Sequence, residues 1–191
     1  MKATFVLMHQ AVPTEIVDEI NELAKNYELV DSTVGSQSGE LKLNENIRKS
    51  KVRWLPVFQD ETTKLSNLVL NLFEQSNRQL FGLDIKSFYD MQYTEYFAED
   101  QGFYKNHHDC FMGSSEMYDR KLSMTMQLSD SDDYEGGDFQ FADDEIKIDA
   151  KKLRDKGSVL IFPSFVTHRV TPVTKGHRKS LVVWMEGPAW R

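Results

Sequence analysis

The sequence contains little of what stabilises small secreted domains or binds nucleic acids. A single cysteine, Cys110, in 191 residues excludes an internal disulfide, so we expect a reducing, cytoplasmic setting. The 30 acidic side chains outnumber the 23 basic ones and give a net charge of -7, whereas binding to a phosphate backbone normally needs a clustered basic face. We therefore expect no nucleic-acid partner.

Long hydrophobic runs are also missing. The segment 1–12, MKATFVLMHQAV, has a short apolar stretch that ends at His9, too short to span a membrane and weak as a secretory signal. We therefore expect no membrane partner. Without low-complexity tracts or repeats, residues 1–191 are expected to form one catalytic domain whose core needs no structural metal. A metal in this chain is therefore expected to serve chemistry.

Two amphipathic helices are predicted in the first part of the chain. Residues 13–27 and 60–81 place apolar side chains at helical spacing, and Gly82 follows as a terminating residue. Residues 31–50 between them are polar and rich in Gly, Ser and Asn, which predicts a long loop and a candidate substrate-binding segment.

After Gly82 the hydrophobic period changes from helical to alternating. Short segments rich in β-branched and aromatic residues are separated by Gly, Asp, Ser and Pro, which predicts roughly seven or eight strands. Because no long helix separates them, we expect an antiparallel sandwich or jelly roll. The predicted class is α+β, with helical support and loops in residues 1–86 and the β core in residues 87–188.

The stretch YKNHHDCF contains the candidate metal ligands. Alternate residues of a strand point to one side, so His107 and Asp109 face the same way. His168, which follows the apolar strand SVLIF, is the best third ligand. Two histidines and a carboxylate form the facial triad of non-haem Fe(II) oxygenases, although zinc hydrolases also use such sets.

A candidate anion-binding group follows ten residues after His168. By alternation Arg178, Ser180, Val182 and Trp184 share one face of a strand. A guanidinium beside a hydroxyl suits a carboxylate ligand, and the competing interpretation is an ordinary surface arginine at the start of a strand.

The combined motifs resemble those of a known family. The order YTEYFAEDQGFYKNHHD, RKLSMTMQLSD, YEGGDFQF, GSVLIFPSFVTHRV and GHRKSLVVWMEGP is similar to the 2-oxoglutarate/Fe(II) dioxygenases of the prolyl 4-hydroxylase-like branch. The resemblance covers about residues 87–188. It implies a double-stranded β-helix, the jelly-roll or cupin-like core of that superfamily, with the N-terminal helices as support.

The resemblance also implies roles for individual residues. His107, Asp109 and His168 would hold Fe(II), and Arg178 would pair with the distal carboxylate of 2-oxoglutarate. Gln127 falls where some related hydroxylases carry a second carboxylate-binding tyrosine, which leaves its role open. The side chains placed in the cosubstrate pocket are Tyr96, Tyr104, Gln127, Ser180 and Trp184.

The implied reaction consumes O2 and 2-oxoglutarate and hydroxylates an unactivated C–H bond, with ascorbate as a reductant. The resemblance favours a prolyl residue in a peptide or protein as the substrate, and a free amino acid or other small molecule is the alternative. A catalytically silent β-sandwich binding module, a zinc hydrolase and an enzyme that repairs alkylated bases also stay open. The repair enzyme is disfavoured because Trp184 stands where that branch carries a second arginine.

Several other features have simpler interpretations. Cys110 with His108 is a weak nucleophile and base pair, because no third orienting group is evident. His177 is expected to be a solvated turn residue, and the acidic run 129–138, SDSDDYEGGD, a hairpin loop. Residues 110–120, CFMGSSEMYDR, are a second candidate substrate loop.

Overall fold

Strands dominate the fold, as the alternating pattern predicts. The computed structural model describes residues 1–35, 41–110 and 117–190. The helical elements are α1 (Thr14–Ala24), α2 (Thr63–Ser76), the π-helix η1 (Asn77–Phe81), the 3-10 turn η2 (Ser131–Asp133) and α3 (Ala150–Arg154). The strands are β1 (Val6–Met8), β2 (Val30–Asp31), β3 (Val34–Gly35), β4 (Leu41–Lys42), β5 (Arg48–Lys49), β6 (Lys51–Pro56), β7 (Asp90–Phe97), β8 (Phe103–His107), β9 (Tyr118–Gln127), β10 (Tyr134–Gly136), β11 (Phe139–Phe141), β12 (Val159–Pro163), β13 (His168–Val170) and β14 (Val173–Pro188).

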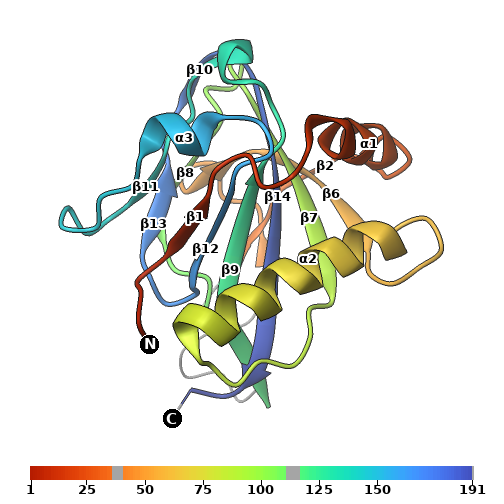
Figure 1. Cartoon of the computed structure of the whole chain (residues 1–191). Helices are drawn as coiled ribbons and strands as arrows, with labels where there is room; N and C mark the ends of the chain where they lie inside the picture. The colour runs from red at the N-terminus through yellow and green to blue at the C-terminus, as the bar shows by residue number, and fades with distance from the viewer. Residues whose placement is uncertain (36–40, 111–116, 191) are drawn as a thin grey trace.

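Antiparallel pairing arranges most of these strands in two sheets. The larger sheet has the order β1-β12-β9-β14-β7-β6-β2, with β10 paired to β14, and the smaller has the order β11-β13-β8-β5. Phe139 and Phe141 of the smaller sheet pack against Leu160 and Phe162 of the larger one. The predicted α+β class with a double-stranded β-helix core is confirmed (Figure 1).

The main hydrophobic core lies between the larger sheet and the helices α1 and α2. In Figure 1, α2 crosses the front of this sheet and α1 lies at the upper right. One row of this core runs across five paired strands and consists of Leu55, Met91, Val183, Met124 and Ile161. All five side chains are fully buried. Each contributes about 1.5–3 kcal/mol by its burial, so this row fixes the register of the strands.

The opposite face of the same strands is polar and nevertheless buried. Neighbouring residues of a strand point to opposite sides, so the residues that alternate with the core row face the smaller sheet. Gln92, Thr94, Thr125, Gln127 and Ser180 are all less than 8% exposed on this face. Polar side chains are rarely buried without a specific role, so this face indicates a functional site in the space between the two sheets.

The helices match the sequence prediction closely. The segment predicted at 60–81 forms α2 and then a π-helical turn, η1, that ends at Gly82 with φ 64°. Glycine is favoured there because a side chain is strained in the left-handed region.

Residues 1–86, expected to form helical support and loops, also contribute strands to both sheets. β1, β2 and β6 join the larger sheet and β5 joins the smaller one. These strands are short, and their partners β12, β7 and β8 are distant in sequence. Local periodicity therefore did not reveal them.

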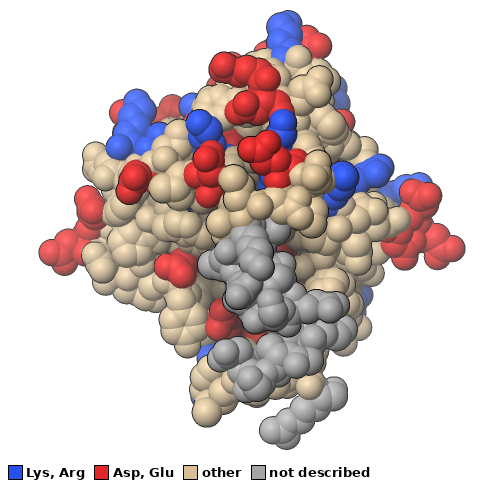
Figure 2. Space-filling view, turned by 180° about the vertical axis from the view of Figure 1, so that it is seen from behind, with Lys and Arg blue, Asp and Glu red and all other residues tan. Residues whose placement is uncertain are grey.

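Both chain ends lie toward the bottom of Figure 1, and β10 marks the opposite end of the molecule. Seen from behind, acidic and basic side chains gather in the half of the surface near β10, and uncharged side chains are more frequent in the other half (Figure 2). Within the described part of the chain, no helix is long and apolar enough to cross a membrane.

Candidate metal centre

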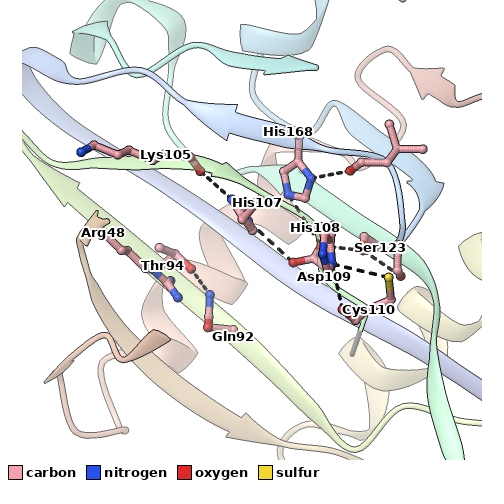
Figure 3. Close-up of polar contacts among 12 residues, drawn as sticks. Arg48, Gln92, Thr94, Lys105, His107, His108, Asp109, Cys110, Ser123 and His168 are labelled. Atoms are coloured by element: carbon pink, nitrogen blue, oxygen red, sulfur yellow. Dashed lines mark hydrogen bonds and ion pairs between the residues drawn. The ribbon is translucent and has the colours of Figure 1, made fainter. Parts of the chain in front are cut away.

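Two histidines and one aspartate converge between the sheets. His107 is the last residue of β8, Asp109 lies two residues beyond it, and His168 begins β13, directly opposite His107 in the antiparallel pair. His107 Nε2 lies 3.7 Å from Asp109 Oδ1, and His168 Nε2 lies 3.6 Å from Asp109 Oδ2. The three candidate ligand atoms lie within 4.8 Å of one another, and Figure 3 shows the side chains pointing toward a common centre.

The backbone fixes which nitrogen of each histidine faces this centre. His107 Nδ1 lies 2.8 Å from the Lys105 carbonyl oxygen, and His168 Nδ1 lies 2.9 Å from that of Val166. A carbonyl oxygen can only accept, so each Nδ1 carries the proton and donates it. Each Nε2 therefore presents a lone pair toward Asp109, as a metal ligand must.

The charges of the site also suit a divalent cation. Burial, helped by the neighbouring His168, lowers the pKa of His107 to about 3 and keeps its imidazole neutral. Burial opposes ionisation of Asp109, but His168, His107 and Arg120 together lower its pKa. Two imidazoles and one carboxylate form the ligand set typical of non-haem Fe(II), with positions left for further ligands.

A serine from the larger sheet orients the aspartate. Ser123 of β9 donates a hydrogen bond of 2.6 Å to Asp109 Oδ2, and its hydroxyl also lies 3.0 Å from that of Ser164. Both serines are fully buried. Ser123 was not predicted from the sequence, although the strand pattern places it on the inner face opposite Trp184.

Tyr104 supports one wall of the site. Its ring stacks on that of His107 with centroids 3.5 Å apart, and the Arg48 guanidinium lies 4.8 Å from the centre of the Tyr104 ring. Burial, with a further contribution from Asp109, raises the pKa of Tyr104 to about 12, so its phenol remains neutral. Sequence reasoning placed Tyr104 in the pocket but did not identify Arg48.

Arg178 lies on the inner face of the larger sheet near the start of β14. It is 4% exposed, it pairs in register with Tyr96 of β7, and its guanidinium lies 5.4 Å from the centre of the Tyr96 ring. Among the residues that the structure describes, its guanidinium forms no hydrogen bond or ion pair. A buried arginine without an anion is costly, so the position suits an anionic ligand.

The remaining predicted pocket residues follow the inner face along β9 and β14. Ser180 is opposite Gln127, one pleat from Arg178. Trp184 lies further along, where the Arg120 guanidinium stacks on its ring at 3.8 Å, and its buried Nε1 has no hydrogen-bond partner among the described residues. Arg120, also missed by sequence reasoning, has a pKa lowered chiefly by burial.

The structure adds to one of the simpler interpretations and corrects another. His108 Nδ1 lies 3.6 Å from the Cys110 sulfur and 2.8 Å from the Cys110 carbonyl oxygen. His177 is not a solvated turn residue: it lies in β14, stacks on Phe97 and places Nε2 2.9 Å from the carboxylate of Glu95.

The predictions for the acidic run and for the two candidate substrate loops agree only in part with the structure. Residues 129–138 form η2, β10 and the turn after it, and Asp138 pairs with Arg154 at 2.8 Å. Residues 31–50 contain β2 to β5 rather than one long loop. Residues 36–40 and 111–116 of the two candidate substrate segments lie outside the described residues.

Comparisons with known proteins agree with this geometry. The family model described as the 2OG-Fe(II) oxygenase superfamily matches residues 91–186. A PKHD-type hydroxylase of Gloeothece citriformis is 30% identical over 183 residues, which cover 92% of this chain and 76% of that protein.

Two solved structures share the fold. The viral collagen prolyl hydroxylase of Paramecium Bursaria Chlorella virus-1, in its 2OG complex, has a TM-score of 0.72 and 15% identity over 97% of both chains. A prolyl hydroxylase of Trichoplax adhaerens, in complex with a peptide fragment of hypoxia inducible factor, has a TM-score of 0.70 and 20% identity over 95% of this chain and 83% of that one. At these identities the two structures show the architecture alone.

Proposed function

Since this chain belongs to the 2OG-Fe(II) oxygenase superfamily and is an iron- and 2-oxoglutarate-dependent hydroxylase, we propose that it hydroxylates a prolyl residue of a polypeptide. The observation that carries the reaction type is the convergence of His107, Asp109 and His168 beside the buried Arg178. The proposal for the substrate rests on the relatives, which include proteins named as prolyl hydroxylases.

The protein's own residues have three tasks in this proposal. His107, Asp109 and His168 hold ferrous iron, which together with 2-oxoglutarate supplies the oxidising power to hydroxylate a C–H bond. Arg178 holds the distal carboxylate of 2-oxoglutarate, and Tyr96 and Ser180 flank it on the same face of the sheet. The surrounding sheets exclude water, because the polar inner face is almost fully buried.

A polypeptide substrate is supported by one named complex and by charge. The Trichoplax adhaerens enzyme is described with a peptide bound, and the net charge of -7 here favours a basic partner over an acidic one. We also propose a cytoplasmic location, because the chain has one cysteine and ferrous iron needs a reducing setting.

The reaction type is tested by aerobic incubation with Fe(II) and 2-oxoglutarate and measurement of succinate. We expect succinate formation that is abolished in His107→Ala and Asp109→Ala but retained in His9→Ala, a histidine at the surface paired with Asp155. Succinate formation by either ligand variant at the wild-type rate would remove that residue from the metal site.

The anion site is tested by 2-oxoglutarate affinity. Arg178→Ala removes a charge-assisted contact of about 2–3 kcal/mol, so the dissociation constant should rise about 30- to 150-fold. Arg169→Ala is the matched control, because Arg169 is exposed and, among the described residues, its guanidinium bonds to Gln140 alone. Equal affinities in the two variants would place the distal carboxylate elsewhere.

The substrate is tested by mass spectrometry of proline-containing peptides, free proline and free lysine after incubation with the enzyme. A mass increase of one oxygen on peptidyl proline is expected. Oxygen incorporation into a free amino acid alone would assign the enzyme to small-molecule hydroxylation instead.

A further inference from the structure

A small cavity lies beside Arg178. Residues from the larger sheet, from the turn after β10 and from α3 surround it. Its lining residues are Gln127, Tyr134, Gly137, Asp138, Phe139, Ala150, Leu153, Arg154 and Arg178. Two of these side chains, Arg178 and Tyr134, bring hydrogen-bond donors that other described residues do not satisfy.

The two arginines of the cavity, Arg154 and Arg178, differ in whether the described residues satisfy their charge and their hydrogen-bond donors. Arg154 donates to the carbonyl oxygens of Gly136 and Tyr134 and to Asp138 Oδ1, each at 2.8 Å, so its charge and its donors are already used. Arg178 forms no hydrogen bond or ion pair among the described residues and is 4% exposed. Arg178 is therefore the cation of the cavity that still needs a partner.

Tyr134 carries the second unused donor. Gln127 Nε2 donates to the Tyr134 hydroxyl oxygen at 2.9 Å. The phenol oxygen accepts this bond, so the hydroxyl proton remains to be donated, and Gln127 is the hydroxyl's partner within the described chain. Tyr134 is 3% exposed, so water does not readily satisfy that proton.

Gly137 lies beside both the Arg178 stem and the Tyr134 ring. A Cβ at this position would lie 2.9 Å from Arg178 Cδ and 3.4 Å from the ring of Tyr134, and its φ of 63° is in the left-handed region. Only a residue without a side chain fits between them. The stem of Arg178 and the ring of Tyr134 therefore line the same narrow space.

We propose that the Tyr134 hydroxyl, oriented by Gln127, donates to the distal carboxylate of 2-oxoglutarate beside Arg178, as a second anchor for the cosubstrate. This proposal rests on the proposed function. A carboxylate has two oxygens and accepts several hydrogen bonds, so it can satisfy the guanidinium and the phenol together. A hydroxyl supplies a donor without a formal positive charge, in a cavity that already contains the Arg154–Asp138 pair. Gln127, whose role the sequence left open, thereby becomes a positioning residue.

The decisive variant is Tyr134→Phe, which keeps the ring and removes the donor. Binding of 2-oxoglutarate to the Mn(II)-loaded protein is measured by calorimetry, without oxygen or turnover. We expect the dissociation constant to rise about tenfold or more, because a hydrogen bond to a charged group is lost. Tyr93→Phe is the matched control, since Tyr93 is equally buried and its hydroxyl donates to Asn21 at 2.9 Å on the helix-facing side of the sheet.

A second ligand locates the effect on the distal carboxylate. Oxalate carries the two chelating carboxylates but lacks the remote one, so its affinity should be the same in Tyr134→Phe and wild type. An equal loss for oxalate and 2-oxoglutarate would overturn the proposal, because the effect would then not depend on the remote carboxylate. An unchanged 2-oxoglutarate affinity in Tyr134→Phe would overturn it as well.

Gln127→Leu keeps the test decisive if Tyr134→Phe does not fold. It leaves the phenol in place but removes the donor that orients it, so we expect a several-fold loss of 2-oxoglutarate affinity with unchanged oxalate binding. Wild-type affinity in Gln127→Leu would count against the positioning role. If wild-type protein fails to bind 2-oxoglutarate at all, the proposed function itself is wrong, which is a different result from a failure confined to these variants.

Discussion

The hydrogen bond from Ser123 to Asp109 allows a quantitative test of the metal centre. Ser123→Ala deletes a hydroxyl that donates at 2.6 Å to one carboxylate oxygen, while leaving all three candidate ligands in the chain. The bond is short, fully buried and made to an ionised acceptor, so it belongs to the stronger class of hydrogen bonds.

The expected magnitude follows from that bond. Hydrogen bonds to charged groups contribute about 1.5–3 kcal/mol, and loss of a residue that orients a metal ligand typically costs about 10- to 100-fold in metal affinity. We therefore expect the dissociation constant for Mn(II), a stable substitute for Fe(II), to rise at least about tenfold in Ser123→Ala.

Ser164→Ala is the matched control. Ser164 is as buried as Ser123 and its hydroxyl lies 3.0 Å from that of Ser123. Its backbone carbonyl accepts from the Asp109 amide, but within the described part of the chain its hydroxyl forms no hydrogen bond to the Asp109 carboxylate. Calorimetric titration of both variants with Mn(II), after comparison of their urea unfolding curves, isolates the contact with the carboxylate. If Ser123→Ala binds Mn(II) within twofold of Ser164→Ala, the hydroxyl does not orient the ligand and the reasoning fails.

Two further predictions concern stability. Gly157→Ala should unfold at a lower urea concentration than Gly82→Ala. Both glycines have positive φ, but a Cβ at Gly157 would lie 2.0 Å from a backbone oxygen, whereas a Cβ at Gly82 would have nothing within 4 Å. Equal urea midpoints for the two variants would contradict this packing argument. Glu95→Gln should lower the free energy of unfolding by about 2 kcal/mol at neutral pH. Although burial opposes it, His177 and Arg53 lower the pKa of Glu95 from its ordinary 4.5, so this stabilisation is lost as the pH falls through the lower value in the folded protein. The unfolding curves of wild type and Glu95→Gln should therefore converge in acid. A difference in unfolding free energy that does not change with pH would show that the ionised Glu95 carboxylate is not its source.

The predictable part of the site is the part that depends on local spacing. Alternation along a strand places His107 with Asp109, and Arg178 with Ser180 and Trp184, on common faces. The second relation holds in the structure because Arg178, Ser180 and Trp184 all lie in β14. His107 and Asp109 also face the same centre, although β8 ends at His107 and Asp109 lies just beyond the strand.

The parts that sequence reasoning missed depend on contacts between strands. Ser123 of β9 reaches Asp109 beyond the end of β8, and Gln127 of β9 reaches Tyr134 of β10, which pairs with β14. Nothing in the spacing of a single segment specifies such a contact. His177 was misplaced for a related reason, because a histidine next to a glycine suggests a turn, whereas β14 continues through Gly176 by pairing with β10.

The carbonyl oxygens of Lys105 and Val166 make the imidazole orientation a property of the backbone. Each accepts from a histidine two residues further along the same chain segment, and the two segments are joined by the pairing of β8 with β13. A shift in register or fraying of the β8–β13 pairing would disturb the orientation of both imidazoles even if no side chain were changed. Iron affinity and amide exchange in residues 103–107 and 168–170 should accordingly be linked, so that a bound ion slows the opening of these strands and an opened ladder releases the ion.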